Sequence, residues 1–234
     1  MISMNSGRTV FVSGGAGGLG VATVAAFVAE GWRVVAPVRP GRTPPEGSGV
    51  GVVSVEADLS NETDVTAAMA VAAGDPAAPL RAVINLAGAY AGSGLIADTP
   101  VADFEQMLAR NLRPTYLVTR AALPHLVAAG GGAIVCVSSR AALAPFPGAA
   151  GYVTAKAAVL AFAGAVAVEY RKQNVRCNTI VPSVIDTPAN RRDMPDADFS
   201  RWVKPAEIAP TIVFLASDAS APTTGATIPV YGQA

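Results

Sequence analysis

Seven short apolar runs alternate with longer segments of helical period along the chain, and this alternation limits the folds that the sequence can adopt. The apolar runs lie at 9–13, 33–38, 51–56, 81–86, 132–138, 175–181 and 226–230. Strands that alternate with helices favour repeated βαβ units, in which the strands are parallel and helices cover both faces. The sequence therefore predicts an α/β fold with a doubly wound parallel sheet of about seven strands.

The segments between these runs predict the helices. Helical spacing predicts helices at about 18–30, 61–73, 101–129, 151–172 and 205–216, with a break in the third near Arg113–Pro114. Residues 39–49 (RPGRTPPEGSG) predict a loop where a crossover helix would be expected. With no internal repeat and no linker, residues 1–234 are predicted to form one domain.

Composition agrees with such a sheet and argues against other classes of protein. Hydrophobic residues make up 51% of the chain, as a sheet buried on both sides requires. The 17 basic and 17 acidic residues balance, and no basic cluster with aromatic residues predicts a nucleic-acid partner. The uncharged run at 157–168 is too short for a membrane span and predicts a helix in the core or in a subunit contact. Because the first residues show no signal-peptide pattern, we expect a cytoplasmic location.

The few cysteine and histidine residues predict no metal site. Cys136 and Cys177 lie in two predicted strands without a C-x-x-C spacing, so we expect two buried, inert thiols. His125 is the one histidine and lies near the end of a predicted helix. We expect it at the surface, since a histidine near a helix C-terminus is ordinary.

The stretch SGGAGGLG at 13–20 joins the first predicted strand to the first predicted helix. Glycines at such a junction let a phosphate approach the backbone at the helix N-terminus, so the stretch predicts a dinucleotide site. The spacing of Gly14, Gly18 and Gly20 differs from G-x-G-x-x-G, and in a chain with 23 glycines such a cluster can also arise by chance. The strand-turn-helix context favours the dinucleotide site.

A second pattern consists of Ser139, Tyr152 and Lys156. Residues four apart share a helix face, so Tyr152 and Lys156 can address one ligand. An ammonium beside a phenol favours the phenolate, and we therefore expect Lys156 to lower the pKa of Tyr152. Taken alone, the tyrosine and the lysine could equally be a core residue and a solvated one.

Together these motifs identify the chain as resembling the short-chain dehydrogenase/reductase family over nearly its whole length. The segments that carry the resemblance follow the family's order: SGGAGGLG (13–20), ADLS (57–60), NLAG (85–88), Asn111, VSS (137–139), YVTAK (152–156) and NTIVPSVIDTP (178–188). Two positions depart from the family pattern, because Leu86 stands for a second Asn and Ser183 for a Gly after the Pro. Neither departure removes a reacting group.

The resemblance implies a Rossmann-type fold and a set of catalytic residues. Tyr152 would exchange a proton with the substrate oxygen while the nicotinamide exchanges a hydride with the substrate carbon. Lys156 would tune Tyr152 and bind the nicotinamide ribose. Ser139 would hold the carbonyl oxygen in preference to Ser138, because neighbours on a strand face opposite ways. Asn111 would support a water that passes protons to Lys156.

The resemblance also implies how the cofactor is held. Val38 stands where NAD-preferring relatives carry Asp, and Arg39 and Arg42 follow, which predicts NADP(H) in preference to NAD(H). Alternatively, both arginines only solvate a loop. Asp58 would contact the adenine, and Ile185 and Thr187 would reach the carboxamide. The full expected set is Ser13, Gly14, Gly18, Leu19, Gly20, Arg39, Asp58, Leu59, Asn85, Ala87, Gly88, Tyr152, Lys156, Ile185 and Thr187.

The predicted function is NADPH-dependent interconversion of a carbonyl and an alcohol on a small molecule. Residues 186–205 also resemble the matching segment of quinonoid dihydropteridine reductase, which leaves pterin reduction as an alternative. In that segment Met194, Phe199 and Trp202 either recognise the substrate or only pack a lid. A non-catalytic dinucleotide sensor is the alternative from another class. Because alanine and valine surround the helix at 151–172, we expect a homodimer or homotetramer.

Overall fold

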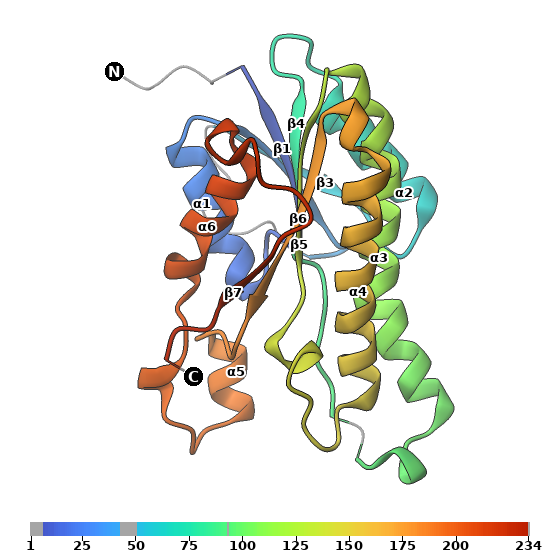
Figure 1. Cartoon of the computed structure of the whole chain (residues 1–234), viewed down its shortest axis with the longest axis vertical. Coiled ribbons are helices and arrows are strands. Elements are labelled where there is room, and N and C mark those ends of the chain that lie inside the picture. The colour runs from blue at the N-terminus through green and yellow to red at the C-terminus, as the bar shows by residue number, and fades with distance from the viewer. Residues whose placement is uncertain (1–6, 43–50, 93, 234) are drawn as a thin grey trace.

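The computed structural model describes residues 7–42, 51–92 and 94–233, and its centre is one sheet of seven parallel strands (Figure 1). The strands run in the order β3-β2-β1-β4-β5-β6-β7, so the doubly wound fold is confirmed. Each strand lies within one residue of its predicted bounds: β1 Thr9–Ser13, β2 Arg33–Val38, β3 Val52–Glu56, β4 Leu80–Asn85, β5 Gly132–Val137, β6 Val175–Pro182 and β7 Thr227–Val230.

Helices cover both faces of this sheet (Figure 1). On one face, α1 (Gly18–Ala29) and α6 (Pro205–Ala216) contact each other and enclose a core that contains Phe27 and Ile212. On the other face, α2 (Glu62–Ala73), α3 (Val101–Ala128) and α4 (Ala150–Glu169) enclose a core that contains Met69 and Leu126. The two cores explain why the strands are apolar on both sides.

The predicted break near Arg113–Pro114 is wrong, because α3 runs without interruption from Val101 to Ala128. Pro114 removes one backbone donor, but it is buried, and the helix packs against both α2 and α4. The next residue is Thr115, whose hydroxyl donates to the Asn111 carbonyl one turn back at 3.0 Å. Tertiary packing therefore outweighs the local cost of the proline.

Two short elements differ from the expected pattern. The helix predicted to reach residue 172 ends at Glu169, and a separate 3-10 turn follows at Arg171–Gln173. The short helix α5 (Pro188–Asp193) was not predicted, although Thr187 caps it and Pro188 is its first residue. Of the loop predicted at 39–49, only residues 39–42 belong to the described chain, and the rest lies outside it.

Within the described part of the chain, α4 is the one helix whose length and composition would suit a membrane span. It packs against α3 and β6 and carries two candidate site residues, Tyr152 and Lys156. This placement agrees with the expectation of a helix against the core. Cys136 and Cys177 are buried on neighbouring strands as expected, and His125 is exposed in the last turn of α3.

The order of the strands places the candidate site. The chain leaves β1 toward β2 on one side and reaches β4 on the other, so β1 and β4 are neighbours where the winding changes direction. In such sheets ligands bind beyond the carboxyl ends of the strands at that point. These ends lie at the lower end of the molecule in Figure 1.

Candidate active site

The glycines that follow β1 leave no room for side chains. Gly14 has φ +72°, and a Cβ there would lie 2.9 Å from the Ala87 nitrogen. A Cβ on Gly20 would lie 2.1 Å from the Gly14 oxygen, so this position of α1 requires glycine. The turn therefore needs glycine for its own geometry and exposes backbone at the helix N-terminus.

The first turn of α1 is suited to an anion. Its N-cap is Gly17, which offers no side-chain acceptor to the N–H groups at the start of the helix. Such groups bind phosphate readily. The next residue, Gly18, is exposed, while Leu19 packs partly buried against the α1–α6 core.

Ser13 has a structural position between β1 and β4. Its side chain is buried, and the hydroxyl donates to the Ile84 carbonyl at 3.2 Å. The same oxygen accepts from the N–H groups of Leu86 (3.1 Å) and Ala87 (3.3 Å). Ser13 thus fixes the chain that leaves β4, and with it Ala87 and Gly88.

Thr187 closes the other side of the glycine turn. A Cβ on Gly18 would lie 2.5 Å from Cγ2 of Thr187, so the two residues are in contact. The Thr187 hydroxyl accepts from the Asn190 N–H at 3.2 Å and begins α5. Ile185 forms a bridge with Val203, which holds the chain before α5. Of these two expected cofactor residues, Thr187 therefore lies beside the first turn of α1.

The two serines after β5 face different surroundings, as the sequence predicts. The Ser138 hydroxyl is buried and donates to the Lys156 carbonyl at 2.7 Å, which ties β5 to α4. Ser139 is partly exposed, and its side chain lies close enough to Tyr152 to lower the pKa of that phenol. Its oxygen also accepts from the Ala141 N–H at 3.2 Å. Only Ser139 is therefore placed to meet a substrate together with Tyr152.

Lys156 is buried and held by a neutral group. Its Nζ donates to the Val137 carbonyl at 3.1 Å and lies 5.8 Å from the centroid of the Tyr152 ring. The side chain is 7% exposed, and burial lowers the pKa of Lys156 to about 8. At neutral pH most molecules therefore carry a positive charge beside Tyr152.

The expected depression of the pKa of Tyr152 is wrong for the protein without ligand. Burial raises the pKa of Tyr152 above its ordinary value, and this effect exceeds the lowering by Ser139. A neighbouring tyrosine, Tyr90, raises it further and packs edge-on at 5.1 Å between ring centroids. Tyr152 is therefore a neutral phenol at physiological pH and can donate a proton.

Asn111 and Gly88 complete the wall beside the lysine. The Asn111 amide donates to the carbonyls of Ala89 (2.9 Å) and Met107 (3.0 Å), and its oxygen accepts from the Ala89 N–H at 3.1 Å. A Cβ on Gly88 would lie 2.6 Å from Oδ1 of Asn111 and 3.1 Å from Nζ of Lys156. Asn111 thus fixes the chain after β4, and its part in a proton relay stays a prediction.

Asn85 is one of the expected cofactor-binding residues, but its side chain lies inside the fold. Its side chain is buried and donates to the Thr119 hydroxyl at 3.0 Å and to the Cys136 sulfur at 3.7 Å. The Asn85 side chain therefore joins β4 to α3 and β5. In this segment, the more exposed backbone of Ala87 and Gly88 is available to contact a cofactor.

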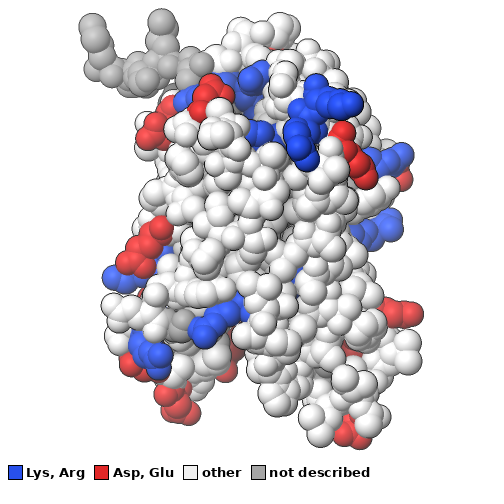
Figure 2. All heavy atoms as spheres, in the orientation of Figure 1, with Lys and Arg blue, Asp and Glu red and all other residues white. Residues whose placement is uncertain are grey.

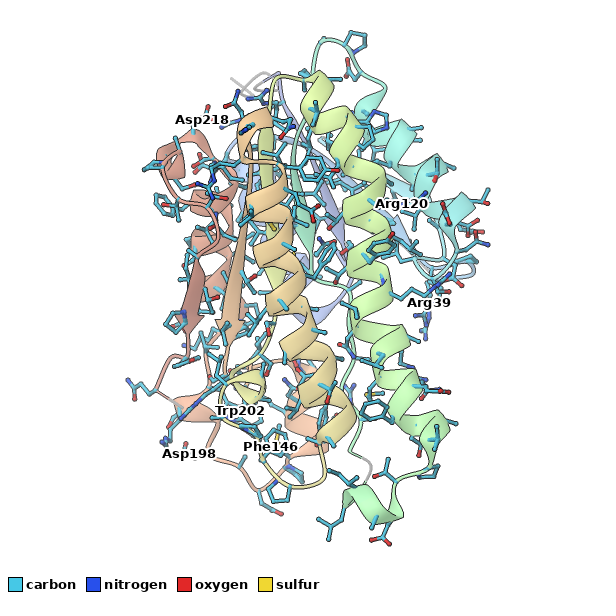
Figure 3. All side chains as sticks on the ribbon, turned by 45° about the vertical axis from the view of Figure 1, so that its right-hand side comes forward. Arg39, Arg120, Phe146, Asp198, Trp202 and Asp218 are labelled. Atoms are coloured by element: carbon cyan, nitrogen blue, oxygen red, sulfur yellow. The ribbon has the colours of Figure 1, made fainter. Side chains whose placement is uncertain are left out.

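Arg39 and Asp58 mark the far side of the site, at the ends of β2 and β3. Val38 is buried, whereas Arg39 is exposed and lies close enough to lower the pKa of Asp58 (Figure 3). The Ser60 N–H and hydroxyl are the larger causes, donating to Asp58 at 2.9 and 2.8 Å. The next residue, Leu59, packs partly buried against the core of α2 and α3.

The segment before α6 forms one side of the site. Trp202 is buried and its ring lies 4.7 Å from that of Phe199, so both pack this segment against the body. Met194 is 39% exposed. Sequence reasoning missed two further aromatic residues: Tyr90, and Phe146, whose ring lies 6.3 Å from that of Tyr90. The position of Tyr90 two residues after NLAG is the signal that could have indicated it.

A glycine turn at a helix N-terminus beside a Ser-Tyr-Lys group is the arrangement of a dinucleotide-dependent oxidoreductase. The family model described as short chain dehydrogenase matches residues 8–198. The chain belongs to the short-chain dehydrogenase/reductase family and is an NAD(P)-dependent oxidoreductase of that family.

Known proteins are similar over nearly the whole chain. A 2-(R)-hydroxypropyl-CoM dehydrogenase of Xanthobacter autotrophicus is 34% identical, covering 96% of this chain and 97% of that protein. A 3-alpha-(or 20-beta)-hydroxysteroid dehydrogenase of Mycobacterium tuberculosis is 33% identical, covering 97% and 88%. Among solved structures, a short-chain dehydrogenase/reductase from Mycobacterium ulcerans has a TM-score of 0.89 at 26% identity, covering 99% and 90%. ElxO with NADP bound has a TM-score of 0.86 at 25% identity, covering 96% and 97%.

Proposed function

We propose that this protein is an NADPH-dependent reductase of a small carbonyl compound, or in reverse a dehydrogenase of the alcohol, with Tyr152 as acid and base. One observation carries the proposal: Ser139, Tyr152 and the buried Lys156 lie together, with Nζ of Lys156 5.8 Å from the Tyr152 ring and Ser139 close enough to lower the pKa of the Tyr152 phenol. The curated relatives named above are dehydrogenases by name.

The protonation states favour proton donation by Tyr152. Its raised pKa keeps the phenol neutral, so it can donate a proton to the oxygen of a carbonyl that is being reduced. Ser139 donates a hydrogen bond to the same oxygen. The Lys156 charge then stabilises the phenolate that forms on Tyr152. In the alcohol-to-ketone direction the same phenolate takes the proton back.

The residues present fit a nicotinamide dinucleotide. The pyrophosphate would meet the uncapped N-terminus of α1, where side chains at Gly14 and Gly20 would clash with backbone. The exposed backbone at Gly88, together with Ile185 and Thr187, would line the nicotinamide end. When bound, the nicotinamide supplies or takes up the hydride. The protein supplies position and the proton.

The preference for NADPH is proposed from Arg39. This arginine follows the last residue of β2, where a 2′-phosphate would lie, and it is exposed. Its guanidinium offers paired donors that suit phosphate. No carboxylate stands at residue 38 to hold the ribose hydroxyls of NAD. Asp58 is already engaged by Ser60.

The substrate is proposed to be a ketone with an apolar substituent. Two exposed aromatic side chains extend from Tyr152: Tyr90 packs on the Tyr152 ring, and Phe146 packs on Tyr90. The test is a panel of aliphatic and aromatic ketones, β-ketoacyl thioesters, quinones and quinonoid dihydropterin, each with NADPH and with NADH. Reduction of ketones with NADPH supports the proposal. Activity confined to the dihydropterin would favour the pterin alternative.

A homodimer or homotetramer is proposed from the outer surface of α4. Its exposed positions are Thr154, Ala161, Ala165 and Val168, followed by Glu169. Beside them lies a cavity of about 640 Å³ lined by α2, α3 and α4, in which Tyr116 packs on Phe162. Sedimentation velocity should show that the parent protein is a dimer or a larger oligomer. The Ala165→Glu substitution should shift the equilibrium toward the monomer. A parent protein that is monomeric at micromolar concentration would contradict this assembly.

A further inference from the structure

A second cavity, of about 460 Å³, lies at the amino-terminal edge of the sheet, away from the catalytic residues. Its lining includes four arginines: Arg8 before β1, Arg81 in β4, Arg171 in the turn after α4, and Arg176 in β6. Asp218 is the one acidic residue in the described lining. Figure 3 shows Asp218 at the upper end of the molecule and Trp202 and Phe146 near the lower end. Figure 2 shows Lys and Arg side chains gathered at the upper end.

The arginines of this cavity are held by neutral acceptors. Arg81 donates to the Ala129 carbonyl at 2.5 Å. Arg176 donates to the carbonyls of Ser217 (2.9 Å) and Thr223 (3.2 Å) and to the Ser220 hydroxyl (2.9 Å). Within residues 7–42, 51–92 and 94–233, the ion pairs formed by arginine join Arg33 to Asp75, Arg120 to Glu62 and Arg191 to Asp186. None of these ion pairs includes Arg81, Arg171 or Arg176.

The Arg176 guanidinium is also partly removed from water. Burial lowers the pKa of Arg176, although nearby Asp218 acts in the opposite direction. A guanidinium remains charged in proteins even so. A fixed, partly desolvated positive charge attracts an anion more strongly than a mobile surface charge does.

Trp32 and Arg8 form one wall of this cavity. Trp32 is 2% exposed, and in the described part of the chain its indole N–H finds no acceptor. The Arg8 guanidinium lies over its ring at 4.2 Å.

We propose that this arginine cavity binds a free oligophosphate at a site separate from the active site. Without counting Arg8, three arginines against one aspartate leave two positive charges in excess, which suits linked phosphates. Arginine forks bind phosphate oxygens in pairs. The cavity also has room for more than a single phosphate group.

The direct test is calorimetric titration of tripolyphosphate into the protein saturated with its tighter-binding reduced dinucleotide. Saturation blocks the N-terminus of α1, where phosphate would otherwise bind. We expect one tripolyphosphate per chain, with an affinity that falls as salt rises. No binding, or binding seen only before the dinucleotide is added, would overturn the proposal. Citrate of equal affinity would overturn the assignment to phosphate.

A matched pair of variants locates the site. Arg171 lines the cavity, and the adjacent Lys172 does not; both are exposed in the same turn. Arg171→Ala should weaken tripolyphosphate binding about tenfold, because it removes a charge-assisted hydrogen bond. Lys172→Ala should change it less than about twofold, since its charge is screened by solvent. Equal losses in the two variants would show a general charge effect and overturn the proposed site.

Discussion

The Lys156 ammonium donates to the carbonyl oxygen of Val137 at 3.1 Å, and this contact ties the catalytic helix to the end of β5. The carbonyl partner carries no charge, and the lysine is buried. Burial disfavours the charged form of Lys156 and lowers its pKa to about 8. The active site therefore contains a cation whose burial costs free energy. The same charge is available to a phenolate on Tyr152.

Replacing Lys156 by Met should stabilise the ligand-free protein at pH 7 and abolish turnover. The folded-state pKa of about 8 lies below the ordinary value of 10.5, so holding the charge costs at most on the order of 3 kcal/mol. Between these values the unfolded chain binds the proton more tightly, and the stability of the parent should rise with pH. The measurement is urea unfolding of both proteins from pH 7 to pH 10.

The advantage of the Lys156→Met variant should therefore shrink as the pH rises through about 8 to about 10. Lys172→Met is the control, since it makes the same substitution at an exposed lysine away from the active site. A Lys156→Met variant that is less stable than the parent at pH 7 would show that burial of the charge is not costly.

Substitutions of the neighbouring residues Ser138 and Ser139 should have different effects, the first on stability and the second on turnover. Ser138→Ala should lower the free energy of unfolding by about 1 kcal/mol, because it removes a buried hydrogen bond to the Lys156 carbonyl. Ser139→Ala should lower kcat by about 10², as the loss of one donor to a reacting oxygen does. Unfolding and steady-state kinetics on both variants test this. The reverse assignment of effects would mean that Ser138 holds the substrate.

Arg39→Ala should weaken NADPH binding by about tenfold and leave NADH binding nearly unchanged, because only NADPH carries the 2′-phosphate. Fluorescence titration with both cofactors gives the two affinities. Arg120→Ala is the matched control, since this arginine pairs with Glu62 on the outer surface of α2 and α3. Equal affinity of the parent for both cofactors would remove the role assigned to Arg39.

Local sequence patterns predicted the sheet well, because the five inner strands are mostly buried and apolar, and all seven strands are bounded by loops or helices. These patterns failed where packing against segments distant in the sequence determines the local structure. The sequence marks Pro114 as a break, yet packing of α3 between α2 and α4 keeps the helix continuous. Thr187 and Pro188 carried a helix-start signal, but the six residues of α5 are too few for a periodic pattern.

The sequence predicted which residues form the candidate site better than it predicted the pKa values of these residues. The spacing of Ser139, Tyr152 and Lys156 predicted which side chains meet. The direction of the Tyr152 pKa depends on burial by the chain around it, which spacing does not encode. The arginine cavity was not predicted at all, since its four arginines are spread from Arg8 to Arg176 in the sequence.

The central claim is that Tyr152 transfers the proton, and Tyr152→Phe isolates it by removing one oxygen while keeping the ring that packs against Tyr90. Tyr116→Phe, on the outer surface of α3, makes the same change away from the site and should keep parental turnover. Cofactor affinity should stay near parental in both variants.

The deciding measurement is therefore kcat of Tyr152→Phe with saturating reduced cofactor and a ketone that the parent reduces well. The account predicts a fall of about 10²–10⁴, the contribution of general acid catalysis. A kcat within about threefold of the parent would contradict it, since general acid catalysis by Tyr152 would then be absent.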